Sequence, residues 1–122
     1  MEETLLREGA HADGIFFCPH YPKGPVPEFS VDCNCRKPKT GLIDQACKRF
    51  EIDISRSYMI GDHYTDMELA ERARLMGILV KTGYGEGVIQ YNLPHINFRP
   101  SYIAKDLLDA VEWIIKDKEA LP

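Results

Sequence analysis

The sequence predicts a single α/β domain in which helices flank a parallel sheet. Short apolar runs of strand length alternate with segments whose apolar residues recur at helical spacing. The chain has 122 residues, of which 44% are hydrophobic and 28% charged, and these values are typical of one globular domain. Strands that alternate with helices generally pair in parallel, and such sheets bind ligands beyond the carboxyl ends of their strands.

The first half of the chain is predicted to contain a helix end, a strand, a long loop and a helix. Residues 1–8 resemble the end of a helix, with Gly9 as the residue that follows it. Residues 14–17 are predicted to form a short buried strand. The loop of residues 18–37 contains four prolines and is too long for an idle connection. The apolar face of the next helix, which begins near Gly41, consists of Leu42, Ile43, Ala46, Cys47 and Phe50.

Two strands and one helix follow. Residues 57–60 form an apolar strand that ends at Gly61-Asp62. Thr65 and Glu68 match a capping box, which predicts that a helix begins at Thr65. Residues 78–80 are the next strand.

The last part is predicted to be a loop, a short strand and a helix. Five glycines and prolines predict that residues 82–100 are mostly loop. A strand around residues 102–103 leads into the final helix. The predicted apolar face of that helix consists of Leu107, Leu108, Val111, Ile114 and Ile115.

Charge and hydropathy exclude two classes of partner. The net charge is −4 and the chain has no basic stripe, so neither a nucleic acid nor a zinc-ribbon type of nucleic-acid binding is expected. The apolar runs are too short for a membrane span, and the N-terminus does not match a signal peptide. A cytoplasmic location is therefore predicted.

Two pairs of metal-binding side chains lie within the long loop. Cys18 and His20 form one pair, Cys33 and Cys35 form the other, and twelve residues separate the pairs. Three thiolates and one imidazole would complete a tetrahedral, structural zinc site, and the metal would supply folding energy to the loop. The alternatives are a Cys33–Cys35 disulfide or four unrelated polar residues.

Two further motifs carry charges that suit a phosphate and a magnesium ion. Arg36 and Lys37 directly follow the pair of cysteines at residues 33 and 35, and both types of side chain bind phosphate. Asp62 and Asp66 emerge at a strand end, where carboxylate oxygens suit magnesium. The alternative interpretations are a solvated basic pair and, for Asp66, compensation of the helix N-terminal charge or binding to Lys37.

Several residues beside these motifs have a simpler interpretation. His63 could touch phosphate, but exposure on the surface is the favoured interpretation for it. Tyr21, Tyr64 and Tyr84 border the same rim, and packing is expected for each of them. Cys47 lies on an apolar helix face and is expected in the core.

Together, these motifs resemble the family of D-glycero-D-manno-heptose 1,7-bisphosphate 7-phosphatases. The resemblance rests on Cys-Pro-His at residues 18–20, Cys-Asn-Cys-Arg-Lys-Pro at residues 33–38, and Tyr-Met-Ile-Gly-Asp at residues 58–62 with Asp66-Met67. It covers nearly all of the chain. These enzymes are zinc-containing members of the haloacid-dehalogenase superfamily, so the resemblance implies a Rossmann-like domain over residues 1–122 with a zinc-bound loop.

The resemblance also implies a mechanism. In this family an aspartate attacks phosphorus, a second aspartate two residues later acts as acid and base, and magnesium bridges the reacting groups. On this chain, the resemblance implies that Lys37 is the phosphate lysine, Asp62 the magnesium ligand, and Arg36 a substrate contact. Asp66 is implied to support the same site. The substrate would be a sugar bisphosphate used in nucleotide-heptose and lipopolysaccharide precursor synthesis.

Two departures from the family pattern affect the expected activity. The family's opening Asp-x-Asp strand has no counterpart, and Asp13 precedes a predicted strand rather than ending one. The chain is therefore expected to be an incomplete, inactive fragment at its N-terminal side, completed by the missing segment or by a second copy. The other departure is His63, which stands where relatives usually have Lys or Arg.

Two alternative functions remain open at this point. One is histidinol-phosphate phosphatase, and the other is a non-catalytic zinc module that binds sugar phosphates.

Overall fold

A computed structural model describes residues 7–18 and 36–120 of the chain. Its sheet has three parallel strands in the order β1-β2-β3, which are β1 (Tyr58–Gly61), β2 (Met76–Val80) and β3 (Tyr102–Ala104). Tyr58 pairs with Met76, and Ile78 pairs with Tyr102. The three strands follow the predicted order and lie near the predicted residues, because each one is a short apolar run bounded by polar or turn-forming residues.

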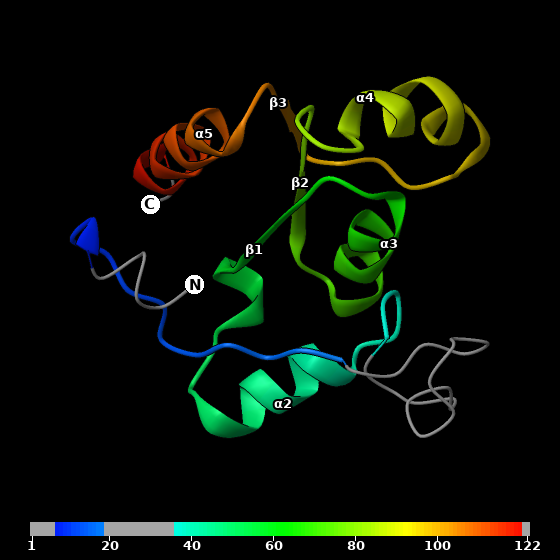
Figure 1. Ribbon diagram of the computed structural model, residues 1–122. Coiled ribbons are helices and arrows are strands. Elements are labelled where there is room, and N and C mark those ends of the chain that lie inside the picture. The colour runs from blue at the N-terminus through cyan, green and yellow to red at the C-terminus, as the bar shows by residue number, and fades with distance from the viewer. Residues whose placement is uncertain (1–6, 19–35, 121–122) are drawn as a thin grey trace.

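Two helices cover the two faces of this sheet, as Figure 1 shows. On one face, α3 (Tyr64–Ala73) packs against β1 and β2, and Met67 joins Leu79 in the core there. On the other face, α5 (Leu107–Ala120) packs so that Ala110 contacts the cluster of Ile78 and Val80. Successive strand residues point to opposite faces of a sheet. Because Ile78, Leu79 and Val80 are all apolar, β2 is apolar on both faces.

The buried face of α5 differs from the predicted one. Ala110 is fully buried, and Trp113 and Ile114 pack beside it. Four residues of the predicted apolar face are instead exposed in the described structure: Leu107, Leu108, Val111 and Ile115. The prediction failed because large apolar residues occur on both sides of this helix, and the small Ala110 allows the closest approach to the sheet.

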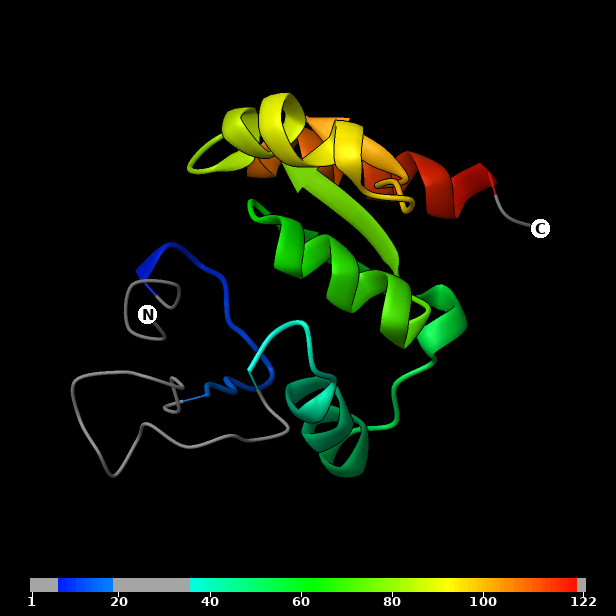
Figure 2. The ribbon, with the colours of Figure 1, turned by 90° about the vertical axis from the view of Figure 1, so that its right-hand side faces the viewer.

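The region before β1 consists of α2 (Gly41–Arg49) and the 3-10 turn η2 (Ile54–Arg56). In Figure 2, α2 lies beside the extended segment of residues 7–18 and apart from the sheet. The predicted strand at residues 14–17 is wrong, because these residues pair with no strand among those described and Phe17 is 75% exposed. Phe16 instead packs edge to face against Phe50, with the ring centroids 6.5 Å apart.

Cys47 is exposed on α2, so its predicted place in the core is also wrong. Leu42, Ile43 and Ala46 on the same helix are only half-buried. The helix was predicted correctly from its period of 3.6 residues. The period alone does not determine how many residues of the apolar face are buried against the rest of the protein.

The segment after β2 is helical rather than a loop. It contains α4 (Gly85–Gly87), a π-helical turn η3 (Val88–Asn92) and a 3-10 turn η4 (Leu93–His95). Val88 and Leu93 join the core on the α3 face. The glycines and prolines in this segment led to the wrong prediction, because they are compatible with single helical turns as well as with loops.

The N-terminus of α3 also differs from the prediction. His63, rather than Thr65, is the N-cap residue, and its capping-box partner is Asp66 rather than Glu68. Thr65 is therefore the second residue of the helix. No helix among residues 7–18 and 36–120 combines the length and the apolar character needed to cross a membrane.

Candidate functional site

The candidate site lies at the carboxyl end of β1, where the strand passes directly into α3. Gly61 ends the strand, Asp62 follows it, and His63 caps the helix. A Cβ atom added at Gly61 would overlap the side chain of Asp66, so only glycine allows the carboxylate to approach the backbone this closely. The sequence Gly-Asp-x-x-x-Asp thus folds both carboxylates toward one edge of the sheet.

An ion pair joins this edge to the segment before α2. The Nζ atom of Lys37 donates a hydrogen bond to Oδ1 of Asp66 at 2.6 Å. The Asp66 side chain is only 6% exposed, whereas that of Lys37 is 45% exposed. A buried carboxylate is tolerated when it is paired and hydrogen-bonded, and Lys37 supplies the opposite charge. Asp66 makes both of the contacts left open for it, the ion pair with Lys37 and the capping-box hydrogen bond at the N-terminus of α3.

The second oxygen of Asp66 binds the backbone that carries Asp62. Oδ2 of Asp66 accepts hydrogen bonds from the N–H of Asp62 at 3.2 Å and from the N–H of His63 at 3.1 Å. Asp66 thereby accepts three hydrogen bonds, one from the Lys37 ammonium and two from backbone amides. It therefore holds Lys37 and the Asp62 backbone in fixed positions relative to each other.

The Asp62 side chain has fewer hydrogen-bond partners than that of Asp66. Its Oδ2 accepts a hydrogen bond from the N–H of Tyr84 at 3.3 Å, and Oδ1 has no partner among the described residues. Gly83 adopts a φ angle of +63°, and a Cβ atom there would overlap Oδ2 of Asp62. A half-buried carboxylate oxygen at a strand end is a suitable magnesium ligand, because magnesium usually takes only one or two protein carboxylates.

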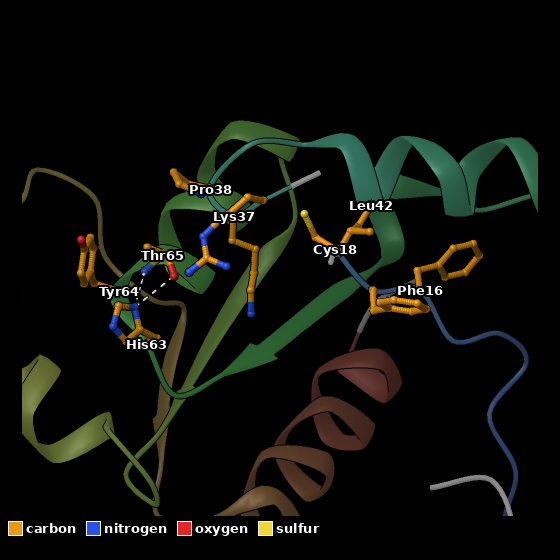
Figure 3. A pocket seen from close by; sticks show the side chains of 10 residues that line it. Phe16, Cys18, Lys37, Pro38, Leu42, His63, Tyr64 and Thr65 are labelled. Carbon is orange, nitrogen blue, oxygen red and sulfur yellow. Dashed lines mark hydrogen bonds between the residues drawn. The ribbon is translucent and has the colours of Figure 1, made fainter. Parts of the chain in front are cut away.

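A cavity of about 670 Å³ adjoins these charges. Figure 3 shows His63, Tyr64 and Thr65 on one side of it, Phe16, Cys18 and Leu42 on the other, and Lys37 and Pro38 between them. Arg36 also lines the cavity. Both predicted phosphate-binding cations therefore face the same space, and the volume is in the usual range for small-ligand sites.

His63 is held in one orientation on the rim. Its Nδ1 accepts the N–H of Thr65 at 3.3 Å and lies 3.0 Å from Oγ1 of the same residue. A backbone N–H can only donate, so the neutral ring carries its proton on Nε2. The ring also contacts two tyrosines, Tyr64 with centroids 4.6 Å apart and Tyr84 with centroids 5.8 Å apart.

The structure brings together Arg36, Lys37, His63 and the two aspartates. Sequence reasoning missed the contribution of Tyr84, which contacts Asp62 through its backbone. Gly83 was the available signal, because a glycine directly before this residue permits the positive φ angle that brings the amide to Asp62. The side-chain identity of Tyr84 contained no such signal.

The zinc prediction lies mostly outside the described residues. His20, Cys33 and Cys35 are not among them, whereas Cys18 borders the cavity. Within residues 7–18 and 36–120, no three His, Cys, Asp or Glu side chains are grouped to hold a metal ion. The zinc site therefore stays a prediction.

Several known proteins that are similar to this chain are heptose bisphosphate phosphatases. Residues 34–110 match the family model described as HAD-hydrolase-like. The chain is 42% identical to D-glycero-D-manno-heptose-1,7-bisphosphate 7-phosphatase of Thermosynechococcus vestitus over 93% of this chain and 60% of the relative. It is also 42% identical to D-glycero-beta-D-manno-heptose-1,7-bisphosphate 7-phosphatase of Escherichia coli K12 over 100% of this chain and 56% of the relative.

A solved structure shares the same fold. It is the D,D-heptose 1,7-bisphosphate phosphatase of B. bronchiseptica, complexed with magnesium and phosphate. The TM-score is 0.75 at 28% identity, and the match covers 95% of this chain and 59% of the other. The chain thus spans less than two thirds of the length of these relatives.

Proposed function

Because the chain belongs to the HAD-hydrolase-like family, we propose that it forms the phosphate- and magnesium-binding part of a phosphatase that removes the 7-phosphate of D-glycero-D-manno-heptose 1,7-bisphosphate. The names of the matched relatives support this substrate. They do not favour the histidinol-phosphate alternative or a non-catalytic module. The chain matches only part of each relative, so the activity is proposed for the whole protein to which these residues belong.

One observation carries the proposal, namely the pairing of Lys37 with the buried Asp66 beside Asp62. In this proposal, Asp66 is a positioning residue that holds the Lys37 ammonium over the phosphoryl group. Lys37 neutralises charge on the phosphoryl oxygens, and Arg36 binds the substrate from the same cavity. The arrangement suits phosphoryl transfer, because that reaction depends on positioning and charge stabilisation.

Asp62 is the proposed magnesium ligand. Its Oδ1 atom is available for a cation, and its Oδ2 atom is fixed by the Tyr84 amide. A bound magnesium ion would supply positive charge to the phosphoryl oxygens. The magnesium in the B. bronchiseptica structure is consistent with this ligand chemistry. Zinc held by Cys18, His20, Cys33 and Cys35 is proposed as a structural ion, because a set of thiolates and an imidazole suits zinc.

The test is release of inorganic phosphate from heptose 1,7-bisphosphate in the presence of magnesium. Two proteins are compared, the 122-residue chain and the same chain joined to an N-terminal segment with the Asp-x-Asp element that the family resemblance implies. We expect release by the longer protein only, and a loss of at least about a hundredfold in its Lys37→Ala and Asp62→Ala variants.

Each outcome has a definite meaning. Release by the 122-residue chain alone would keep the phosphatase activity but overturn the prediction that the nucleophile lies outside these residues. Release that is unaffected by both substitutions would overturn the roles of Lys37 and Asp62. Release by neither protein would overturn the proposed function.

A further inference from the structure

Three aromatic rings form a corner next to the proposed phosphate site. The His63 ring lies tilted by 35° against Tyr64, with a centroid distance of 4.6 Å. It lies edge to face with Tyr84 at 85° and 5.8 Å. His63 and Tyr64 line the cavity, whereas Tyr84 lies outside its lining and contacts His63. We call these three side chains the aromatic corner.

Packing does not explain the position of Tyr84, although the sequence favoured packing for both tyrosines. Tyr84 is 71% exposed, whereas packed aromatic residues bury most of their surface. Tyr64 is 37% exposed and lies against His63. Neither tyrosine hydroxyl has a hydrogen-bond partner among the described residues. The Tyr84 ring therefore presents apolar area next to His63, on the rim of the charged site.

We propose that the aromatic corner binds the saturated ring of a sugar phosphate, while Arg36 and Lys37 bind its phosphate. This inference rests on the proposed function and extends it from the phosphate to the sugar. Aromatic faces carry partial negative charge and are apolar, so they attract the weakly positive C–H bonds on the face of a sugar ring. The site would thereby distinguish a phosphosugar from free phosphate.

The angles between the rings favour a sugar over a planar base. A base stacks best when it lies parallel to an aromatic face or between two parallel faces. The rings of His63 and Tyr84 are nearly perpendicular, so they bound a corner rather than a parallel slot. A puckered ring with C–H bonds in several directions can contact both walls of a corner at once.

The corner is fixed to the charged site before any ligand arrives. His63 is oriented by its hydrogen bond from the Thr65 N–H, and the Tyr84 backbone is tied to Asp62. A preorganised surface loses little conformational entropy on binding. The backbone that carries Tyr84 is therefore held next to Asp62 before any ligand arrives.

Binding measurements on the 122-residue chain test this inference without relying on turnover. Isothermal titration with magnesium present gives the affinities for heptose 1,7-bisphosphate, inorganic phosphate and adenosine monophosphate. The variants are Tyr84→Leu, which removes the ring, and Tyr84→Phe, which keeps it. Tyr91→Leu is the matched control, because Tyr91 is a similarly exposed tyrosine that does not touch the corner.

We expect Tyr84→Leu to weaken the sugar bisphosphate by about threefold to tenfold and to leave inorganic phosphate unchanged. Tyr84→Phe and Tyr91→Leu should match the wild type. An unchanged affinity in Tyr84→Leu, or adenosine monophosphate binding more tightly than the sugar, would overturn the inference. Failure of the proposed function looks different: the wild type would not bind inorganic phosphate, or Lys37→Ala would not weaken it.

Discussion

At the residue scale, Asp66 is the centre of the site. It accepts one hydrogen bond from Lys37 and two from backbone amides while its side chain is almost fully buried. A group with this many partners cannot be replaced without leaving donors unsatisfied. Asp66 therefore belongs to the stability of the fold as well as to the geometry of the site.

Replacement of Asp66 by alanine should lower the free energy of unfolding by about 2–4 kcal/mol, because one ion pair and two hydrogen bonds are lost at a buried position. Urea denaturation measures this change. Asp44→Ala is the control, since Asp44 is an exposed aspartate in the first turn of α2 with one hydrogen bond from Thr40. It should cost less than about 1 kcal/mol. Equal losses in both variants would contradict the role of Asp66.

Gly83 has a similar position beside Asp62. Gly83→Ala should lower the free energy of unfolding by about 1–3 kcal/mol, because the new Cβ would combine a positive φ angle with an overlap with the carboxylate. The increase in Tm that magnesium produces should shrink in the same variant. Gly87→Ala is the control: Gly87 has a helical φ of −65° and open space at its Cβ position.

The control should be neutral or stabilise the protein by up to about 1 kcal/mol, because alanine restricts the unfolded chain. A magnesium response that survives unchanged in Gly83→Ala would argue against Asp62 as the ligand. Differential scanning fluorimetry with and without magnesium gives the Tm of each variant and the increase in Tm that magnesium produces.

At the element scale, the strands and helices were more predictable than their surroundings. β1 and β2 were predicted because buried parallel strands are nearly continuous apolar runs, and Ile78, Leu79 and Val80 are such a run. The run at residues 14–17 is also apolar but pairs with no described strand, so apolar character alone led to a wrong prediction. The helical turns at residues 85–95 are too short to show a period.

The candidate site was predictable in part for a related reason. Lys37, Asp62 and Asp66 belong to motifs with a chemical logic, so they could be selected before their distances were known. The aromatic corner could not be selected, because exposure decides whether a tyrosine packs or binds. Exposure depends on how α3 and the segment after β2 pack in the folded protein, and no sequence motif links these two segments.

Two tyrosine–aspartate hydrogen bonds tie α5 to the sheet. The Tyr58 hydroxyl donates to Oδ2 of Asp117 at 2.6 Å, and the Tyr102 hydroxyl lies 3.2 Å from both oxygens of Asp109. The hydrogen bond to Asp117 and partial burial raise the pKa of Tyr58 above 10.0. Partial burial and the hydrogen bond to Asp109 likewise raise the pKa of Tyr102 above 10.0.

A raised pKa in the folded state means that folding favours the neutral phenol. Its stabilising contribution is complete below pH 10.0 and is lost as the pH rises through the raised pKa, because the unfolded tyrosines ionise first. The free energy of unfolding should therefore decline above pH 10.0, and less steeply in Tyr58→Phe. Denaturation followed by circular dichroism measures the decline. Tyr91→Phe, at an exposed tyrosine, should keep the wild-type slope, and an equal slope in Tyr58→Phe would contradict the prediction.

At the scale of the whole molecule, the site joins two parts of the chain. Arg36 and Lys37 come from the segment before α2, whereas Asp62 and Asp66 come from the end of the sheet. The Lys37–Asp66 ion pair spans 29 positions of sequence. The position of the cations therefore depends on what holds the segment before α2, and the predicted zinc loop of residues 18–37 ends at Lys37 itself.

If zinc closes that loop, its removal should disturb the phosphate site as well as the loop. We expect about one zinc ion per chain in the purified protein, and a large loss of zinc in Cys33→Ser, because a tetrahedral site needs all four of its ligands. Inorganic phosphate should bind more weakly to that variant, since the residues leading into Arg36 and Lys37 would lose their anchor. Cys47→Ser is the matched control, because Cys47 is exposed on α2 and is not a predicted ligand. Elemental analysis measures the zinc content of both variants, and titration measures their affinity for phosphate. Equal zinc contents would contradict the predicted zinc site. Lost zinc with unchanged phosphate binding would contradict the dependence of the phosphate site on the loop.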